Sequence, residues 1–97
     1  MVAEVLNATP SVGLARAATR LLRDAGIDVV YFGSDTGAAA DSTRVLARRG
    51  DPAGAARVAK ALGLGAGAVL QQPDPDRLVD VTVRLGRDFA ARLAQNP

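Results

Sequence analysis

The residues best suited to binding chemistry form a polar turn, Asn7-Ala8-Thr9-Pro10-Ser11, between an apolar run and a segment with helical spacing. Asn tolerates left-handed backbone, and Pro10 directs Thr9 toward extended geometry. Ser11 or Thr9 is then placed to cap the helix, whose free N–H groups and dipole favour anions. Asn7, Thr9 and Ser11 are therefore candidate ligand-binding residues. The alternative is that Asn7 and Ser11 only satisfy turn and cap hydrogen bonds.

Arginines follow this turn at helical spacing. Arg16, Arg20 and Arg23 stand at i, i+4 and i+7, which places them on one face of the helix. Guanidinium groups bind phosphate and carboxylate, so Arg16 and Arg20 join the candidate site, with a polymer that bears such groups or an anionic lipid head group as partner. Two alternatives stay open. The arginines can form a solvated helix face with Asp24 available to Arg20, or they can reflect a genome whose codons favour Arg over Lys.

A second basic group extends through the middle of the chain. Arg48 and Arg49 precede a second helical segment that carries Arg57 and Lys60, and whether its polar face joins the first is left open. The net charge is only +2, and acidic residues are interspersed among the basic ones. Nucleic-acid binding proteins more often concentrate their charge on one face, so we expect no nucleic-acid partner.

Catalysis has little support in the residue types. The chain has no Cys and no His, which removes thiolate nucleophiles, disulfides, the common zinc sites and the residue best suited to proton transfer near neutral pH. Asp35 and Asp41, and Asp74 and Asp76, are paired carboxylates in polar loops where burial would not raise a pKa. Asp74 and Asp76 also lack the further oxygen ligands of a calcium site. We predict no catalytic residue, no metal site and no cofactor.

The hydrophobic pattern predicts the elements that position these residues. Strands are expected at 2–6, 27–32, 42–47, 66–71 and 79–85, helices at 11–25 and 52–62, and a short helix near Phe89. Right-handed crossovers then give an α/β two-layer sandwich, a mixed four- to five-stranded sheet with the two main helices on one face. The residues expected to be buried are Val5, Leu14, Leu21, Ile27, Val29, Val58, Leu62, Val81 and Val83. Leu14, Ala18, Leu21, Leu22 and Ala25 define the expected inward stripe of the first helix.

The length of the chain predicts one domain over residues 1–97. No signal peptide or apolar run of membrane-spanning length is present. Because Met1 directly abuts the first strand, we expect a domain cut from a longer, membrane-anchored protein, so that any membrane contact runs through a segment outside this chain.

Three motifs carry a resemblance to a known family. They are the strand-turn-helix-strand opening from Val2 to Gly33, a central helix with Asp51, Ala55, Ala59, Leu62 and Gly63, and the closing strand with Leu85-Gly86-Arg87-Asp88-Phe89. Together they resemble the LytR C-terminal domain family of bacterial cell-envelope proteins, often found behind a LytR-CpsA-Psr phosphotransferase domain. Family members commonly carry Leu-Asn-Gly where this chain has Leu6-Asn7-Ala8, which weakens a close backbone approach to a ligand there.

The resemblance implies a non-catalytic accessory role on the outer side of the cytoplasmic membrane. The phosphotransferase activity belongs to the separate domain, whose arginine- and aspartate-rich site has no counterpart here. The implied partner is peptidoglycan or a wall glycopolymer. The alternative is docking onto envelope proteins or self-association, through the second face of the sheet or an exposed strand edge.

Overall fold

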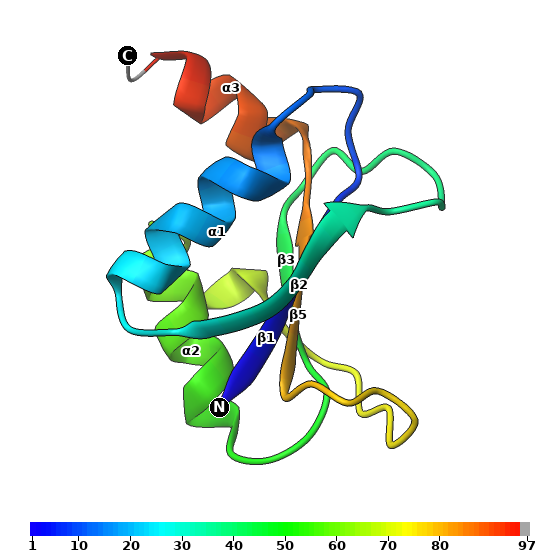
Figure 1. The fold of residues 1–97 in the computed structure, drawn as a ribbon, viewed down its shortest axis with the longest axis vertical. Coiled ribbons are helices and arrows are strands. Elements are labelled where there is room, and N and C mark those ends of the chain that lie inside the picture. The colour runs from blue at the N-terminus through cyan, green and yellow to red at the C-terminus, as the bar shows by residue number, and fades with distance from the viewer. Residues whose placement is uncertain (96–97) are drawn as a thin grey trace.

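The computed structural model describes residues 1–95, which form five strands and three α-helices. The strands are β1 (Val2–Asn7), β2 (Asp28–Ser34), β3 (Arg44–Ala47), β4 (Val69–Gln71) and β5 (Val81–Leu85), and the helices are α1 (Leu14–Asp24), α2 (Pro52–Ala61) and α3 (Arg87–Gln95). A 3₁₀ turn, η1 (Ala66–Ala68), precedes β4. All three α-helices lie on one side of the sheet (Figure 1).

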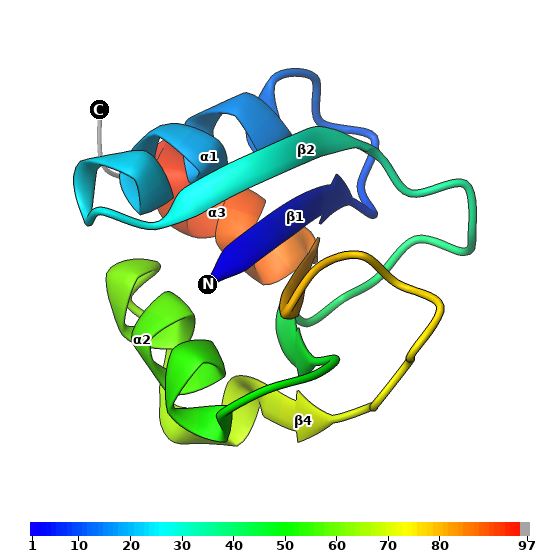
Figure 2. The ribbon, with the colours of Figure 1, turned by 60° about the horizontal axis from the view of Figure 1, so that its bottom comes forward.

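One mixed sheet joins the five strands in the order β2-β1-β5-β3-β4. β1 runs parallel to both β2 and β5, β3 pairs with β5 antiparallel, and β3 runs parallel to β4. Two β-α-β units, β1-α1-β2 and β3-α2-β4, are thus joined through β5. The predicted α/β two-layer sandwich is confirmed, and Figure 2 shows β2 beside β1 at one edge and β4 at the other.

The core lies between the sheet and the helices, and it is aliphatic apart from one ring. Alternate strand residues such as Val5, Val45 and Val83 are fully buried there, as are Val58 of α2 and Leu22 of α1. Phe89 at the start of α3 is 1% exposed and completes the same cluster. The expected burial is confirmed at eight of the nine positions, and Leu21 is the exception.

Leu21 is 39% exposed, so its predicted burial was wrong. The buried residues of α1 are Leu14, Ala15, Ala18, Thr19 and Leu22. Because residues are 100° apart around a helix, that set centres on Ala18 and Leu22 and leaves Leu21 at the margin. Small alanines, not the leucines used to set the stripe, therefore mark the face that packs closely on the sheet. Ala25 is exposed for a different reason, because it lies beyond the last turn of α1 as the C-cap residue.

Several element bounds differ from expectation, and among them β3 starts at Arg44 rather than at residue 42 and β5 at Val81 rather than at residue 79. Residues 66–68 form the 3₁₀ turn and not the start of a strand, which fits the two glycines that flank Ala66. The first helix starts at Leu14 rather than at residue 11, because Gly13 is its N-cap with φ of 83°. β2 extends two residues beyond the prediction, to Ser34.

Candidate functional site

The polar turn after β1 is organised by the side chain of Asn7. Its Oδ1 accepts from the N–H and the hydroxyl of Thr9 at 3.0 and 2.7 Å, and its Nδ2 donates to the carbonyl of Ser11 at 2.8 Å. The Thr9 hydroxyl in turn accepts from the Ser11 N–H at 3.1 Å. Asn7 is 9% exposed, so its amide serves to fix the turn.

The beginning of α1 carries no side-chain cap. The expectation that Ser11 or Thr9 caps this helix was wrong, because both are held in the Asn7 turn and Gly13 occupies the cap position. No acidic residue lies in the first turn of α1. The positive end of the helix dipole therefore faces the turn without a carboxylate to balance it.

Turn, helix and edge strand together enclose a shallow hollow of about 510 Å³. Four of the five predicted ligand-binding residues line it, namely Asn7, Thr9, Ser11 and Arg16. Its opposite wall is Phe32, Gly33 and Ser34 of β2. The sequence patterns did not single out this wall, because the pairing that brings β2 beside β1 is a long-range contact.

A second hollow of about 450 Å³ continues along α1. Arg20, the fifth predicted residue, lies here with Thr19, Arg23 and Asp24. Arg16 and Phe32 line both hollows, so the two follow one line between the helix and the edge strand. We call this surface the α1–β2 seam. It comprises Asn7, Thr9, Ser11, Arg16, Thr19, Arg20, Arg23, Asp24 and residues 32–34.

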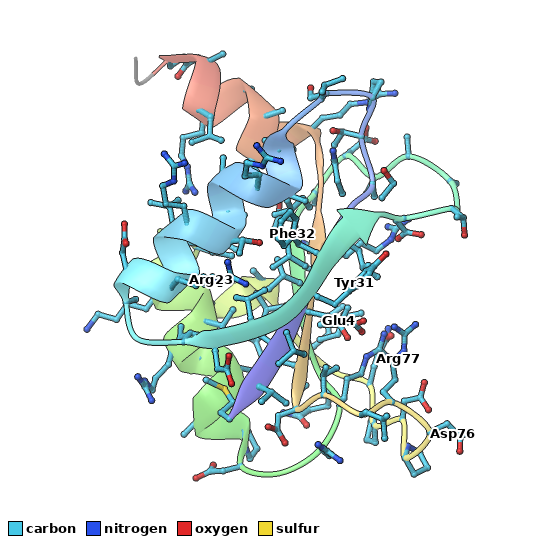
Figure 3. All side chains as sticks on the ribbon, viewed as in Figure 1. Glu4, Arg23, Tyr31, Phe32, Asp76 and Arg77 are labelled. Carbon is cyan, nitrogen blue, oxygen red and sulfur yellow. The ribbon has the colours of Figure 1, made fainter. Side chains whose placement is uncertain are left out.

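The arginines of the seam have no carboxylate partner in the part of the chain that the structure describes. Within residues 1–95, Arg16, Arg20 and Arg23 make no ion pair, and Asp24 does not engage Arg20 as the solvated-face interpretation expects. Arg23 donates to the carbonyl of Val29 at 2.9 Å, and its guanidinium lies 6.0 Å from the centre of the Phe32 ring. Figure 3 shows Arg23 and Phe32 on the helix side of β2.

The second face of the sheet, opposite the helices, carries a polar network that the sequence did not predict. Glu4 of β1 is 9% exposed and accepts from Arg77 and from the hydroxyl of Thr82, both at 2.6 Å. Arg48 donates to the same hydroxyl at 3.1 Å. Asp74 lies 3.6 Å from Arg77. The segment between β4 and β5 thus covers part of this face, where Figure 3 places Glu4, Arg77 and Tyr31.

Two further carboxylates, those of Asp35 and Asp80, serve as structural anchors. Asp35 pairs with Arg84 at 2.6 Å, and the Gly37 N–H and this guanidinium lower its pKa. Asp80 accepts from the Val2 N–H and pairs with Arg49 at 3.1 Å, which also lowers its pKa. Arg48 and Arg49 are thus engaged away from α2. Among residues 1–95, no group of three or more acidic side chains could hold a metal ion.

The closing motif, Leu85 to Phe89, has a structural role. A Cβ on Gly86 would lie 2.5 Å from the backbone of Ser42, so only glycine fits this crossing. Asp88 accepts from the N–H of Thr43 at 2.9 Å and from its hydroxyl at 2.7 Å. Burial raises the pKa of Asp88, but these bonds and the Phe89 N–H outweigh it, and the pKa is lowered overall. These contacts of Gly86 and Asp88 fix the start of α3 against the residues that precede β3.

Comparison with known proteins identifies the family. Residues 2–89 match the family model described as LytR cell envelope-related transcriptional attenuator, so the chain belongs to the LytR C-terminal domain family and to a cell-envelope context, as the motifs indicated. No curated protein and no solved structure matches the chain. None of the helices among residues 1–95 is long and apolar enough to cross a membrane.

Proposed function

We propose that this domain is a non-catalytic accessory module that binds an anionic cell-wall polymer, peptidoglycan or a wall glycopolymer, through the α1–β2 seam. One observation carries the proposal: Arg16 has no carboxylate partner within residues 1–95, and it shares a hollow with Asn7, Thr9 and Ser11. Charge-assisted hydrogen bonds from guanidinium to carboxylate or phosphate supply the affinity. Membership of a cell-envelope family supports placing the domain outside the cytoplasmic membrane, behind an anchor elsewhere in its protein.

A sacculus pull-down with a salt titration tests this function. The wild-type chain is expected to be retained at low salt and released as salt rises, because exposed charges are screened. The Arg16→Ala/Arg20→Ala variant should lose most of this retention. A matched control, Arg57→Ala/Lys60→Ala, removes the same charge from α2, where these residues line a separate hollow. Equal loss in both variants would assign the retention to net charge and contradict the seam.

Protein docking or self-association is the second candidate, and the edge strand β2 supports it. Val30 and Tyr31 are 56% and 54% exposed on this strand, which pairs among the described residues with β1 alone. Exposed apolar edges of this kind recruit partner strands. Light scattering beside the pull-down separates the two functions. A salt-insensitive dimer abolished by Val30→Lys, together with no retention on sacculi at low salt, would replace wall binding with docking.

A further inference from the structure

Phe32 is the apolar element of the seam, and its side chain faces the arginines. Its partner in β1 is Val5, a fully buried core residue, so Phe32 lies on the helix side of the sheet. At the edge strand this position is only partly covered, and the side chain is 37% exposed. Phe32 lines both hollows of the seam together with Arg16. A large apolar ring thus lines hollows that arginine side chains also line.

Arg23 fixes the surroundings of this ring. Its bond to the Val29 carbonyl anchors the guanidinium at 6.0 Å from the ring centre, on the far side of the seam from the polar turn. The other end of the seam offers Arg16 and the hydroxyls of Thr9 and Ser11. An aromatic ring flanked by one fixed guanidinium, that of Arg23, and by the exposed guanidinium of Arg16 fits a ligand that has an apolar face and an acidic rim.

We infer that Phe32 is a stacking platform for a sugar ring that carries a carboxylate or a phosphate. The apolar C–H face of a pyranose ring packs on Phe32, its acidic group pairs with Arg16, and its hydroxyls meet the polar turn. This inference rests on the proposed wall-polymer function and names the ligand class of the same site. The hollow beside the polar turn contains Arg16 and no acidic lining residue, whereas the hollow beside Arg20 and Arg23 also contains Asp24, and this difference favours the polar-turn end for the acidic group.

Three defined oligosaccharides test the ligand class by titration calorimetry on the wild-type chain. Oligogalacturonate carries a carboxylate on each ring, a phosphomannan oligosaccharide carries a sugar phosphate, and a chitin oligosaccharide is neutral. Binding to either acidic sugar with at least about tenfold weaker binding to chitin supports the inference, since a lost charge-assisted bond costs about this factor. Which acidic sugar binds identifies carboxylate or phosphate as the source. Equal binding to chitin, or no binding to either acidic sugar, overturns it.

Substitutions on two adjacent residues of β2 test the platform. Phe32→Leu keeps apolar volume but removes the aromatic face, and should weaken binding of the acidic sugar about three- to tenfold. Tyr31→Leu is the matched control, because Tyr31 stands opposite Glu4 in the sheet register, on the second face, and is more exposed than Phe32, at 54% against 37%. It should leave affinity unchanged, and Phe32→Tyr should retain it. Circular dichroism and the thermal midpoint check that each variant is folded.

The outcomes distinguish failure of this inference from failure of the proposed wall-binding function on which it rests. Retention on sacculi that requires Arg16 and Arg20 but is insensitive to Phe32→Leu overturns the platform and leaves wall binding standing. Equal losses in Phe32→Leu and Tyr31→Leu also overturn it, because a general weakening of β2 explains both. Absence of any wild-type retention defeats the proposed function itself.

Discussion

The second face of the sheet and the α1–β2 seam both carry arginines, but only on the second face do carboxylates neutralise them. On the second face, Arg77 and Arg84 each lie 2.6 Å from a carboxylate, that of Glu4 and that of Asp35. On the seam, Arg16 and Arg20 have no such partner within residues 1–95. A codon preference for Arg acts on both regions equally, so it cannot explain this difference. Pairing, not abundance, indicates which arginines are available to an anionic ligand.

Removing Glu4 should produce the largest loss of stability, because Glu4 is the carboxylate of the network on the second face. Glu4→Ala removes the acceptor that Arg77 and the buried Thr82 hydroxyl share, and Arg48 is left donating to a hydroxyl that has lost its own acceptor. We expect a loss of about 2 kcal/mol in the free energy of unfolding, below the range for a fully buried pair because Arg77 is partly exposed. Urea unfolding measures it. Unchanged stability would mean that the network is not a structural anchor.

Acid should act on the structural carboxylates and not on the seam. The pKa values of Asp35, Asp80 and Asp88 lie below 3.8 in the folded chain, where hydrogen bonds to each carboxylate outweigh its burial. A carboxyl with a depressed pKa stabilises the fold above its unfolded value and loses that contribution as pH falls through the folded value. We expect urea midpoints to be level above pH 3.8 and to drop below it. The drop should be smaller in Asp88→Asn, which has already lost one such group.

The smallest effect on stability is expected at the seam. Arg16→Ala/Arg20→Ala removes two exposed side chains that make no ion pair within residues 1–95, so the free energy of unfolding should change by less than about 0.5 kcal/mol. The alanines also favour the helix slightly. Measured beside Glu4→Ala, this variant sharpens the contrast between the two regions. A large loss here would place Arg16 or Arg20 among the structural arginines.

Local sequence patterns predicted the order of the strands and the main helices well. The alternation from Val79 to Leu85 predicted β5, and Asp51-Pro52 predicted the start of α2, where Asp51 accepts from the Ala53 N–H at 2.9 Å. These signals are contained within a few residues. Leu21 was misplaced because small residues, which give a weak hydrophobic signal, decide the packed face of α1.

Features that depend on distant pairing could not be predicted in this way. Glu4 and Arg77 are 73 residues apart in sequence, and Phe32 reaches the seam only because β2 pairs with β1. For the candidate site, spacing correctly grouped Asn7, Thr9, Ser11 and Arg16, since turn and helix are contiguous. It could not supply the opposite wall, nor show that the capping residues are held in the Asn7 turn.

The central place of β5 in the sheet has a consequence for how this chain folds. β1 pairs with β5, which begins at Val81, and β5 also joins β1 to β3. Neither β-α-β unit can close its inner edge until β5 has been added, so loop closure over most of the chain precedes completion of the sheet. Such a high contact order favours slow folding. During synthesis, the inner edges of β1 and β3 stay unpaired until β5 is added, and this interval is when a chaperone or a premature strand exchange between copies has most influence.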